Sequence, residues 1–96
     1  MYLKKHTTGD RTVLALCDED LLGETFLENG LKLEVSERFY KGTTISAEEA
    51  IKELMTSTNC NLVGKEVIAL ALELELVEQE QIKTIQGIPF TFIFSL

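Results

Sequence analysis

The chain has 96 residues, of which 45% are hydrophobic and 26% charged, and its net charge is −7. This size and composition predict one globular domain, residues 1–96, whose core needs no metal or disulfide. No apolar run approaches the roughly 20 residues of a membrane-spanning helix, and the acidic balance disfavours broad contact with nucleic acid. Because no apolar segment follows the N-terminal lysines, we expect no signal peptide and a cytoplasmic location.

Residues 1–17 predict a β-hairpin. Its arms, residues 2–7 and 12–17, flank the turn dipeptide Gly9-Asp10. The second arm ends in a continuous apolar run, which is typical of a strand buried on both faces. Lysines interrupt the first arm, which indicates a more exposed strand that resists association through its edge.

The next stretch predicts a short helix and then a strand. Asp18 is a candidate N-cap for a helix whose apolar side carries Leu21, Leu22 and Phe26. The turn Asn29-Gly30 leads into an alternating strand whose inward residues are Leu31, Leu33 and Val35. The aromatic pair Phe39-Tyr40 follows, and it would either anchor a partner or close one end of the core.

A capping box begins the second helix. Ser46 and Glu49 stand three residues apart, the spacing at which each side chain accepts a hydrogen bond from the other residue's backbone N–H. The pattern predicts a helix over residues 47–55 that ends near residues 57–59, where polar side chains compete for backbone hydrogen bonds.

The longest apolar-rich stretch, residues 62–77, fits both helical and strand periodicity. Its Ala, Leu and Glu content favours a helix, with Asn61 as the N-cap, lying antiparallel to the preceding helix. Such a helix would have two opposed apolar ridges, one of Val63, Val67, Leu70, Leu74 and Val77, and the other of Ile68, Leu72 and Leu76. The second ridge would be buried within the chain or would form an interaction face.

The C-terminal stretch predicts a second hairpin. Residues 82–85 and 90–94 flank Gln86-Gly87-Ile88-Pro89, with Phe90, Phe92 and Phe94 on one face and Ile93 and Leu96 on the other. The whole order is then two strands, a helix, a strand, two helices and two strands. We therefore predict an α+β fold, with a mostly antiparallel sheet of about five strands and helices packed on one face.

The sequence offers little chemistry. Cys17 and Cys60 lack metal-ligand spacing and are expected to be a reduced pair, with no metal and no cofactor. An enzyme would use Cys17 as nucleophile with Asp18 or Asp20 as base. However, the predicted hairpin places Cys17 beside Tyr2 and away from the single histidine, His6, so no catalytic residue is assigned.

Two binding functions remain. The favoured one is a non-catalytic protein-interaction module, acting by self-association or on a larger assembly, with candidate contacts at Phe39, Tyr40, Ile68, Leu72 and Leu76. The alternative is direct RNA binding by a small basic patch around Tyr40, formed by Lys4, Lys5, His6, Arg11, Arg38 and Lys41.

Three stretches carry a family resemblance: residues 17–26 (CDEDLLGETF), 33–42 (LEVSERFYKG) and 61–64 (NLVG). Their order and spacing resemble the successive signatures of the archaeal "domain of unknown function 424" family. The resemblance implies a small cytosolic protein with no established activity, encoded among translation genes. The family pattern has His or Gln after the C-terminal proline, where this chain has Phe90-Thr91-Phe92.

Overall fold

The computed structural model describes residues 1–94, which form an α+β fold as predicted. The first half contains β1 (Tyr2–Thr8), β2 (Arg11–Cys17), the short 3-10 helix η1 (Glu19–Leu21), β3 (Thr25–Glu28), β4 (Leu31–Glu34), α1 (Glu37–Tyr40) and β5 (Thr43–Thr44). The second half contains α2 (Ala47–Thr56), β6 (Cys60–Val63), α3 (Lys65–Glu73), the 3-10 helix η2 (Gln79–Gln81), β7 (Lys83–Ile85) and β8 (Ile88–Ile93). Leu96, predicted to lie on the face of the last strand opposite the phenylalanines, is outside the described residues.

The central sheet has six strands in the order β5-β1-β2-β6-β8-β7, and β3 pairs with β4 in a separate two-stranded sheet. Four of the five pairings in the central sheet are antiparallel, whereas β2 and β6 run parallel. The sheet is therefore mixed and has one strand more than the approximate number predicted. The parallel pair arises because α2 carries the chain across one face of the sheet between β2 and β6.

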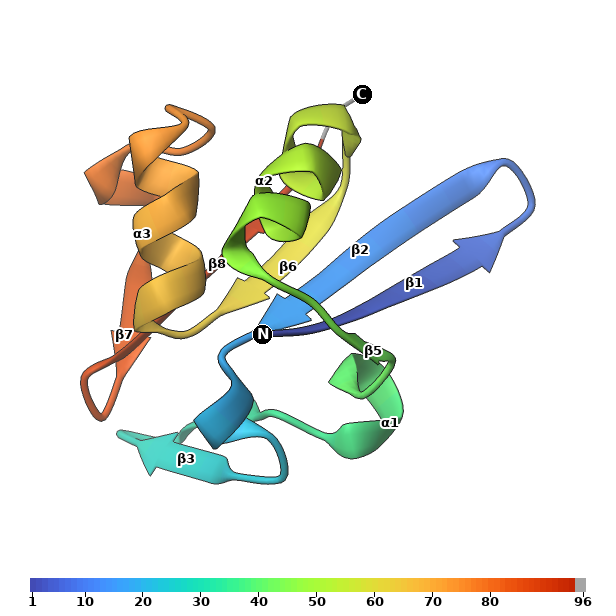
Figure 1. Cartoon of the computed structure of the whole chain (residues 1–96). Helices are drawn as coiled ribbons and strands as arrows, with labels where there is room; N and C mark the ends of the chain where they lie inside the picture. Colours follow the sequence, from blue (N-terminus) through green and yellow to red (C-terminus); the bar gives the residue numbers. More distant parts are fainter. Residues whose placement is uncertain (95–96) are drawn as a thin grey trace.

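Both faces of the sheet are covered, and by different parts of the chain (Figure 1). Leu14, Leu16 and Leu62 pack on one face against buried residues of α2 and α3. On the other face Ala15, Cys17 and Val63 pack against the segment that contains η1, the small sheet and α1. The expectation that helices cover one face is right for α2 and α3, but α1 lies on the opposite face.

The two predicted hairpins and the capping box are confirmed. β1 and β2 pair from Tyr2 opposite Cys17 to Thr8 opposite Arg11, around Gly9-Asp10. β7 and β8 pair around Gln86-Gly87, so Ile88 and Pro89, which were predicted to lie in the loop, belong to β8. At the start of α2, Ser46 Oγ accepts a hydrogen bond from Glu49 N (3.2 Å) and Glu49 Oε1 accepts one from Ser46 N (3.3 Å).

The prediction of one helix over residues 62–77 is wrong at both ends. Leu62 and Val63 belong to β6 and are fully buried between β2 and β8, so the tertiary burial of a central strand overrides the helix propensity. Asn61 is consequently a strand residue, and Gly64 occupies the N-cap position of α3. Because β6 separates α2 from α3, these helices are not joined by the short link that the sequence suggested.

The helix α3 ends in a Schellman motif. Glu75 has a positive φ of 58°, Leu76 N donates to Ala71 O (3.0 Å), and Glu75 N donates to Leu72 O (3.0 Å). This turn takes Leu76 off the helical ridge on which the sequence placed it.

The helix predicted from Asp18 to Phe26 is also wrong. Only Glu19–Leu21 forms a 3-10 helix, and Phe26 lies in β3. Gly23 has a φ of 88°, and its N–H donates to Val35 O (2.7 Å), which turns the chain into the small sheet. The side chain of Asp18 makes no capping hydrogen bond to the N–H groups of this short helix, whereas its backbone carbonyl accepts one from Leu21 N (3.2 Å).

Candidate interaction surface

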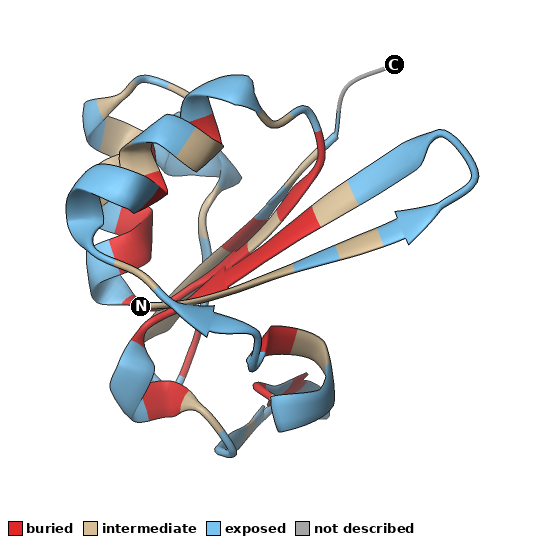
Figure 2. Ribbon diagram, turned by 45° about the vertical axis from the view of Figure 1, so that its right-hand side comes forward, coloured by how far each residue is buried: buried red, intermediate tan, exposed pale blue. Residues whose placement is uncertain are grey.

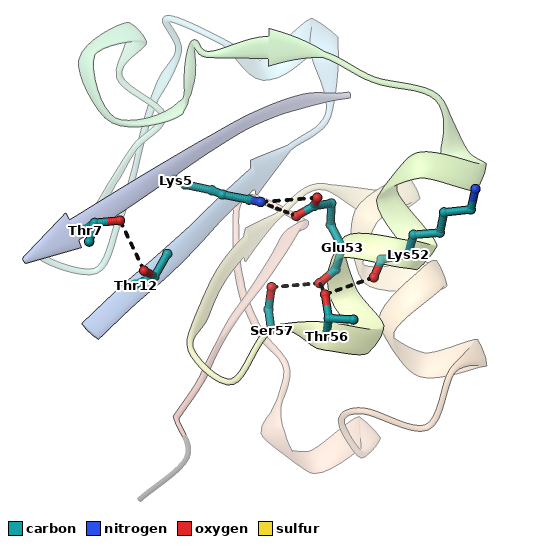
Figure 3. Close-up of polar contacts among 7 residues, drawn as sticks. All are labelled: Lys5, Thr7, Thr12, Lys52, Glu53, Thr56 and Ser57. Carbon is teal, nitrogen blue, oxygen red and sulfur yellow. Dashed lines mark hydrogen bonds and ion pairs between the residues drawn. The ribbon is translucent and has the colours of Figure 1, made fainter. Parts of the chain in front are cut away.

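The alternation of β1 separates the predicted basic residues. Lys4 and His6 lie on the face of the sheet that α1 covers, whereas Lys5 lies on the opposite face. There Lys5 Nζ is 2.9 Å from a carboxylate oxygen of Glu53 on α2 (Figure 3). Neighbouring cations on a strand thus point to opposite sides of the sheet, and they cannot form one phosphate-binding patch.

Lys4 and His6 attach α1 to the sheet. Lys4 Nζ donates to Arg38 O (2.7 Å), and His6 Nε2 donates to Phe39 O (2.8 Å). The His6 ring stacks on that of Phe39, with centroids 4.3 Å apart and planes 14° apart. Both donors bind carbonyl groups at the C-terminal end of the helix, where cations and N–H groups are favourable.

The remaining basic candidates do not converge. Arg11 lies at the hairpin turn, and Arg38 and Lys41 are exposed around α1. Lys41 Nζ lies 4.0 Å from a carboxylate oxygen of Glu37. The aromatic centre proposed for this patch, Tyr40, is 4% exposed and packs in the core beneath α1, so its ring offers no platform for a base.

Two of the candidate catalytic residues, Cys17 and Asp18, are buried. Burial, together with the neighbouring Asp18 carboxylate, raises the pKa of the Cys17 thiol to about 11, which keeps it protonated at neutral pH. Burial also raises the pKa of Cys60 to about 11. As the sequence predicted, the hairpin register places Cys17 opposite Tyr2, whereas His6 lies opposite Val13.

The Asp18 carboxylate caps α3 from a distant part of the sequence. One oxygen accepts from Glu66 N and the other from Val67 N, both at 3.0 Å. These are the N–H groups that a local N-cap side chain would satisfy, but the N-cap residue Gly64 has no side chain. Asp20 lies in the same turn and is exposed.

The second predicted ridge faces the chain's own core. Ile68 is buried, and Leu72 and Leu76 are half-buried against the cluster beneath α2 and α3. These contacts leave little of the ridge for a partner.

An exposed apolar hollow lies elsewhere, on the sheet face that carries α1. It is lined by His6, Val13, Phe39, Asn61, Phe92 and Phe94 and has a volume of about 360 Å³; we refer to it as the aromatic hollow. Phe92 is 50% exposed and Phe94 71% exposed. Their ring centroids are 6.4 Å apart, and Phe92 lies 6.0 Å from Phe90.

Register explains why the hollow is open. Asn61 pairs with Phe92 and Val63 with Phe90, so these residues share one face of the sheet in two rows. The row of Val63 and Phe90 packs in the core beneath the small sheet and α1, whereas in the second row only Phe39 of α1 reaches the hollow. The uncovered row therefore leaves two phenylalanine rings at the surface.

Sequence reasoning found part of this site. It placed Phe90, Phe92 and Phe94 on one face and identified Phe39, but it did not connect them with Val13 or Asn61. The available signal was the spacing of three Phe residues at alternate positions near the end of the chain. Which of them stayed exposed depended on how far the covering segment reaches, and this has no local signature.

Comparison with known proteins identifies the family. Residues 6–96 match the model of the family described as "Protein of unknown function (DUF424)". The chain belongs to this family.

The crystal structure of an uncharacterized conserved protein from the archaeon Methanopyrus kandleri is similar to this DUF424 chain, with 30% sequence identity and a TM-score of 0.81. The match covers 99% of this chain and 92% of that one. No curated protein matches the chain significantly.

Packing explains two glycines in the stretches that carry the family resemblance. A Cβ atom at Gly64 would overlap the Asp18 carboxylate, and one at Gly42 would overlap the backbone carbonyl of Leu3. These glycines permit close contacts between distant segments, which is a structural role. Within residues 1–94, no three His, Cys, Asp or Glu side chains are arranged to hold a metal ion. No helix in the described part of the chain is long and apolar enough to cross a membrane.

Proposed function

We propose that this DUF424 protein is a non-catalytic interaction module that binds a protein partner through the aromatic hollow. The observation that carries the proposal is the exposure of Phe92 and Phe94, at 50% and 71%, beside Val13 and Phe39. Two neighbouring phenylalanine rings left at the surface are unusual in an ordinary solvated face, and aromatic residues are enriched at the centres of protein interfaces.

Burial of the two exposed rings would contribute to the free energy of binding. Full burial of a phenylalanine side chain contributes about 1.5–3 kcal/mol, so covering the exposed parts of both rings would contribute about 2–4 kcal/mol. Asn61 lies on the floor of the hollow and is half-buried, which places an amide group within reach of a polar atom of the partner.

The family resemblance suggests where the partner is found. We expect a cytoplasmic protein of the translation machinery or the ribosome, since the resemblance places such genes among translation genes. A second copy of this chain is the other occupant that the sequence suggested, and a measurement of mass in solution distinguishes the two.

Site-specific crosslinking tests the proposal. Phe92 is replaced by the photo-reactive residue benzoylphenylalanine, and the protein is irradiated in native lysate. Met55 on α2, which is 61% exposed on the opposite face, carries the same residue in the control. We expect a defined protein adduct from position 92 that is absent from position 55 and that decreases at least tenfold when Phe94→Ser is added.

A control variant and two alternative outcomes test whether the adduct depends on the aromatic hollow. A matched Leu27→Ser change, at a residue 60% exposed on β3, should leave the adduct unchanged. An adduct with RNA instead of protein would favour the RNA-binding alternative. Equal labelling from positions 92 and 55, or no adduct from either, would contradict the proposal.

A further inference from the structure

One edge of the central sheet is open beside the aromatic hollow. β6 begins at Cys60, opposite Leu14, and Leu14 N donates to the preceding residue, Asn59 O, at 2.9 Å. Backbone groups of alternate strand residues face the same side, so Thr12 turns its N–H and C=O toward that same edge. Among residues 1–94, no strand continues along β2 beyond Leu14 on this side.

Figures 1 and 2 show the consequence for the hairpin. Its outer half extends past the start of β6 as a free arm (Figure 1). This arm is mostly exposed, whereas the inner half of β2 is buried and that of β1 is half-buried (Figure 2). An exposed strand with unpaired backbone groups is a template for the addition of another strand.

Two hollows of different character flank this open edge. On one face lies the aromatic hollow, with Val13 and Phe94 in its lining. On the other face lies a polar hollow of about 380 Å³, lined by Thr12, Ser57 and Thr58 together with Lys5, Thr7, Asp10, Glu53 and Thr56. Figure 3 shows how Thr12 on the hairpin and Ser57 at the end of α2 border the space between them.

A strand added at Thr12 would place successive side chains in these two hollows. Because side chains alternate across a sheet, an apolar residue facing Phe94 would be followed by a polar residue facing Ser57. The backbone groups of Thr12 would supply the hydrogen bonds, and the two hollows would supply the sequence preference.

Charge indicates the composition of the strand. The hairpin, the segment around α1 and the polar hollow carry five cations against three carboxylates: Lys4, Lys5, Arg11, Arg38 and Lys41 against Asp10, Glu37 and Glu53. The rest of the chain carries four lysines against thirteen carboxylates. The surroundings of the open edge are therefore positive in an acidic protein, which favours an acidic partner.

We infer that the open edge of β2 at Thr12 binds a short extended segment of a partner protein, in which apolar and polar residues alternate between acidic flanks. This inference rests on the proposed function and specifies its mode of binding. A peptide strand fits the edge better than RNA does, because the backbone N–H and C=O of Thr12 match a peptide backbone and the exposed cations do not converge.

The test uses linear 12-residue peptides displayed on phage and selected on the wild-type chain. Enriched peptides are synthesised, and their dissociation constants are measured by fluorescence anisotropy. We expect peptides with alternating apolar residues and Asp or Glu on both sides. Phe94→Ser should weaken their binding at least tenfold.

A matched pair of proline variants isolates the backbone contact. Thr12→Pro removes the N–H at the open edge, whereas Thr7→Pro removes the N–H at the far edge of β1, opposite Thr12 in the register. Both variants lose the same Thr7–Thr12 hydroxyl hydrogen bond (3.1 Å). We expect Thr12→Pro to weaken binding at least tenfold and Thr7→Pro to change it less than twofold. In the wild-type complex, the Thr12 amide should exchange with solvent at least tenfold more slowly.

The outcomes separate the two proposals. Binding that depends on Phe94 but is equal in the two proline variants overturns strand addition and leaves the proposed function standing. Binding that depends on neither site, or enrichment of no peptide, overturns the inference, and an absent protein adduct from position 92 independently overturns the function. Formation of dimers that Thr12→Pro abolishes would assign the edge to a second copy and overturn the partner proposed here.

Discussion

Replacing Asp18 by alanine should destabilise the protein far more than replacing an exposed carboxylate does. The side chain is 5% exposed, and its two oxygens each accept a hydrogen bond of 3.0 Å at the start of α3. A hydrogen bond to a charged group contributes about 1.5–3 kcal/mol, and loss of a helix cap costs about 0.5–2 kcal/mol. The two contacts share one carboxylate and are not additive, so we expect a loss of about 3 kcal/mol.

Urea unfolding followed by circular dichroism measures this loss. For a domain of this size, the dependence of the free energy on urea is about 1.5 kcal/mol per molar, so the midpoint should fall by about 2 M. Asp20→Ala, in the same turn but exposed, is the matched control and should move the midpoint by less than about 0.3 M. Asp18→Asn keeps one of the two acceptor oxygens and loses the charge, so its midpoint should lie between the two.

The position of the damage is as informative as its size. In Asp18→Ala, the amides of Glu66 and Val67 lose their acceptor, so their hydrogen exchange should accelerate more than that of residues later in α3. A midpoint within 0.3 M of wild type, on the same urea scale and with about the same slope, would refute the assignment of Asp18 as the distant cap of α3.

Three further predictions follow from backbone and burial. Gly64→Ala should cost about 3–4 kcal/mol in urea unfolding, because φ is 114° and the new Cβ overlaps the Asp18 carboxylate; the cost should fall in an Asp18→Ala background. Glu75→Gly should raise stability by about 1 kcal/mol, because φ is 58°, whereas Glu73→Gly within α3 should lower it by about the same amount. The free energy of unfolding should fall between pH 9 and 11, because the buried thiols of Cys17 and Cys60 keep protons, with pKa near 11, that the unfolded chain releases near pH 9. Cys60→Ala should reduce this decline by about 2–3 kcal/mol, and an unchanged decline would contradict its assignment to the buried thiol.

Local sequence signals predicted the elements whose stability is local. The first hairpin follows from Gly9-Asp10 between two suitable arms, and α2 follows from the capping box of Ser46 and Glu49. Each of these features is complete within a few residues, so burial elsewhere in the chain does not alter it.

The errors occurred where distant contacts decide the structure. Leu62 and Val63 begin a stretch whose composition favours a helix. However, they pair with residues 46 positions earlier in β2 and with residues 29 and 27 positions later in β8. Asp18 has the pattern of a local cap, but its carboxylate binds N–H groups 48 and 49 residues away. In both cases the local pattern was compatible with two structures, and tertiary packing selected the one that the propensity did not favour.

Only the aromatic residues of the candidate site were predictable from the sequence, and their exposure was not. Period-two alternation places Phe92 and Phe94 on one face of a strand, and the structure confirms this. Whether that face is covered depends on the length of the segment between β2 and α2, and only Phe39 of that segment reaches the hollow. Leu72 and Leu76 were predicted as candidate contacts to a partner, but the chain's own core packs against their apolar ridge.

The opening at the aromatic hollow follows from how the covering segment is fixed at several points. One end is held where Asp18 binds the start of α3, and the other where Gly42 lies against the backbone of β1. Between them, Lys4 and His6 hold the end of α1 over β1. A segment held at these points cannot move across the sheet to cover Phe92 and Phe94, so the rings stay exposed while the fold is intact. A net charge of −7 opposes nonspecific association through such a surface, and the local cations leave it accessible to an acidic partner.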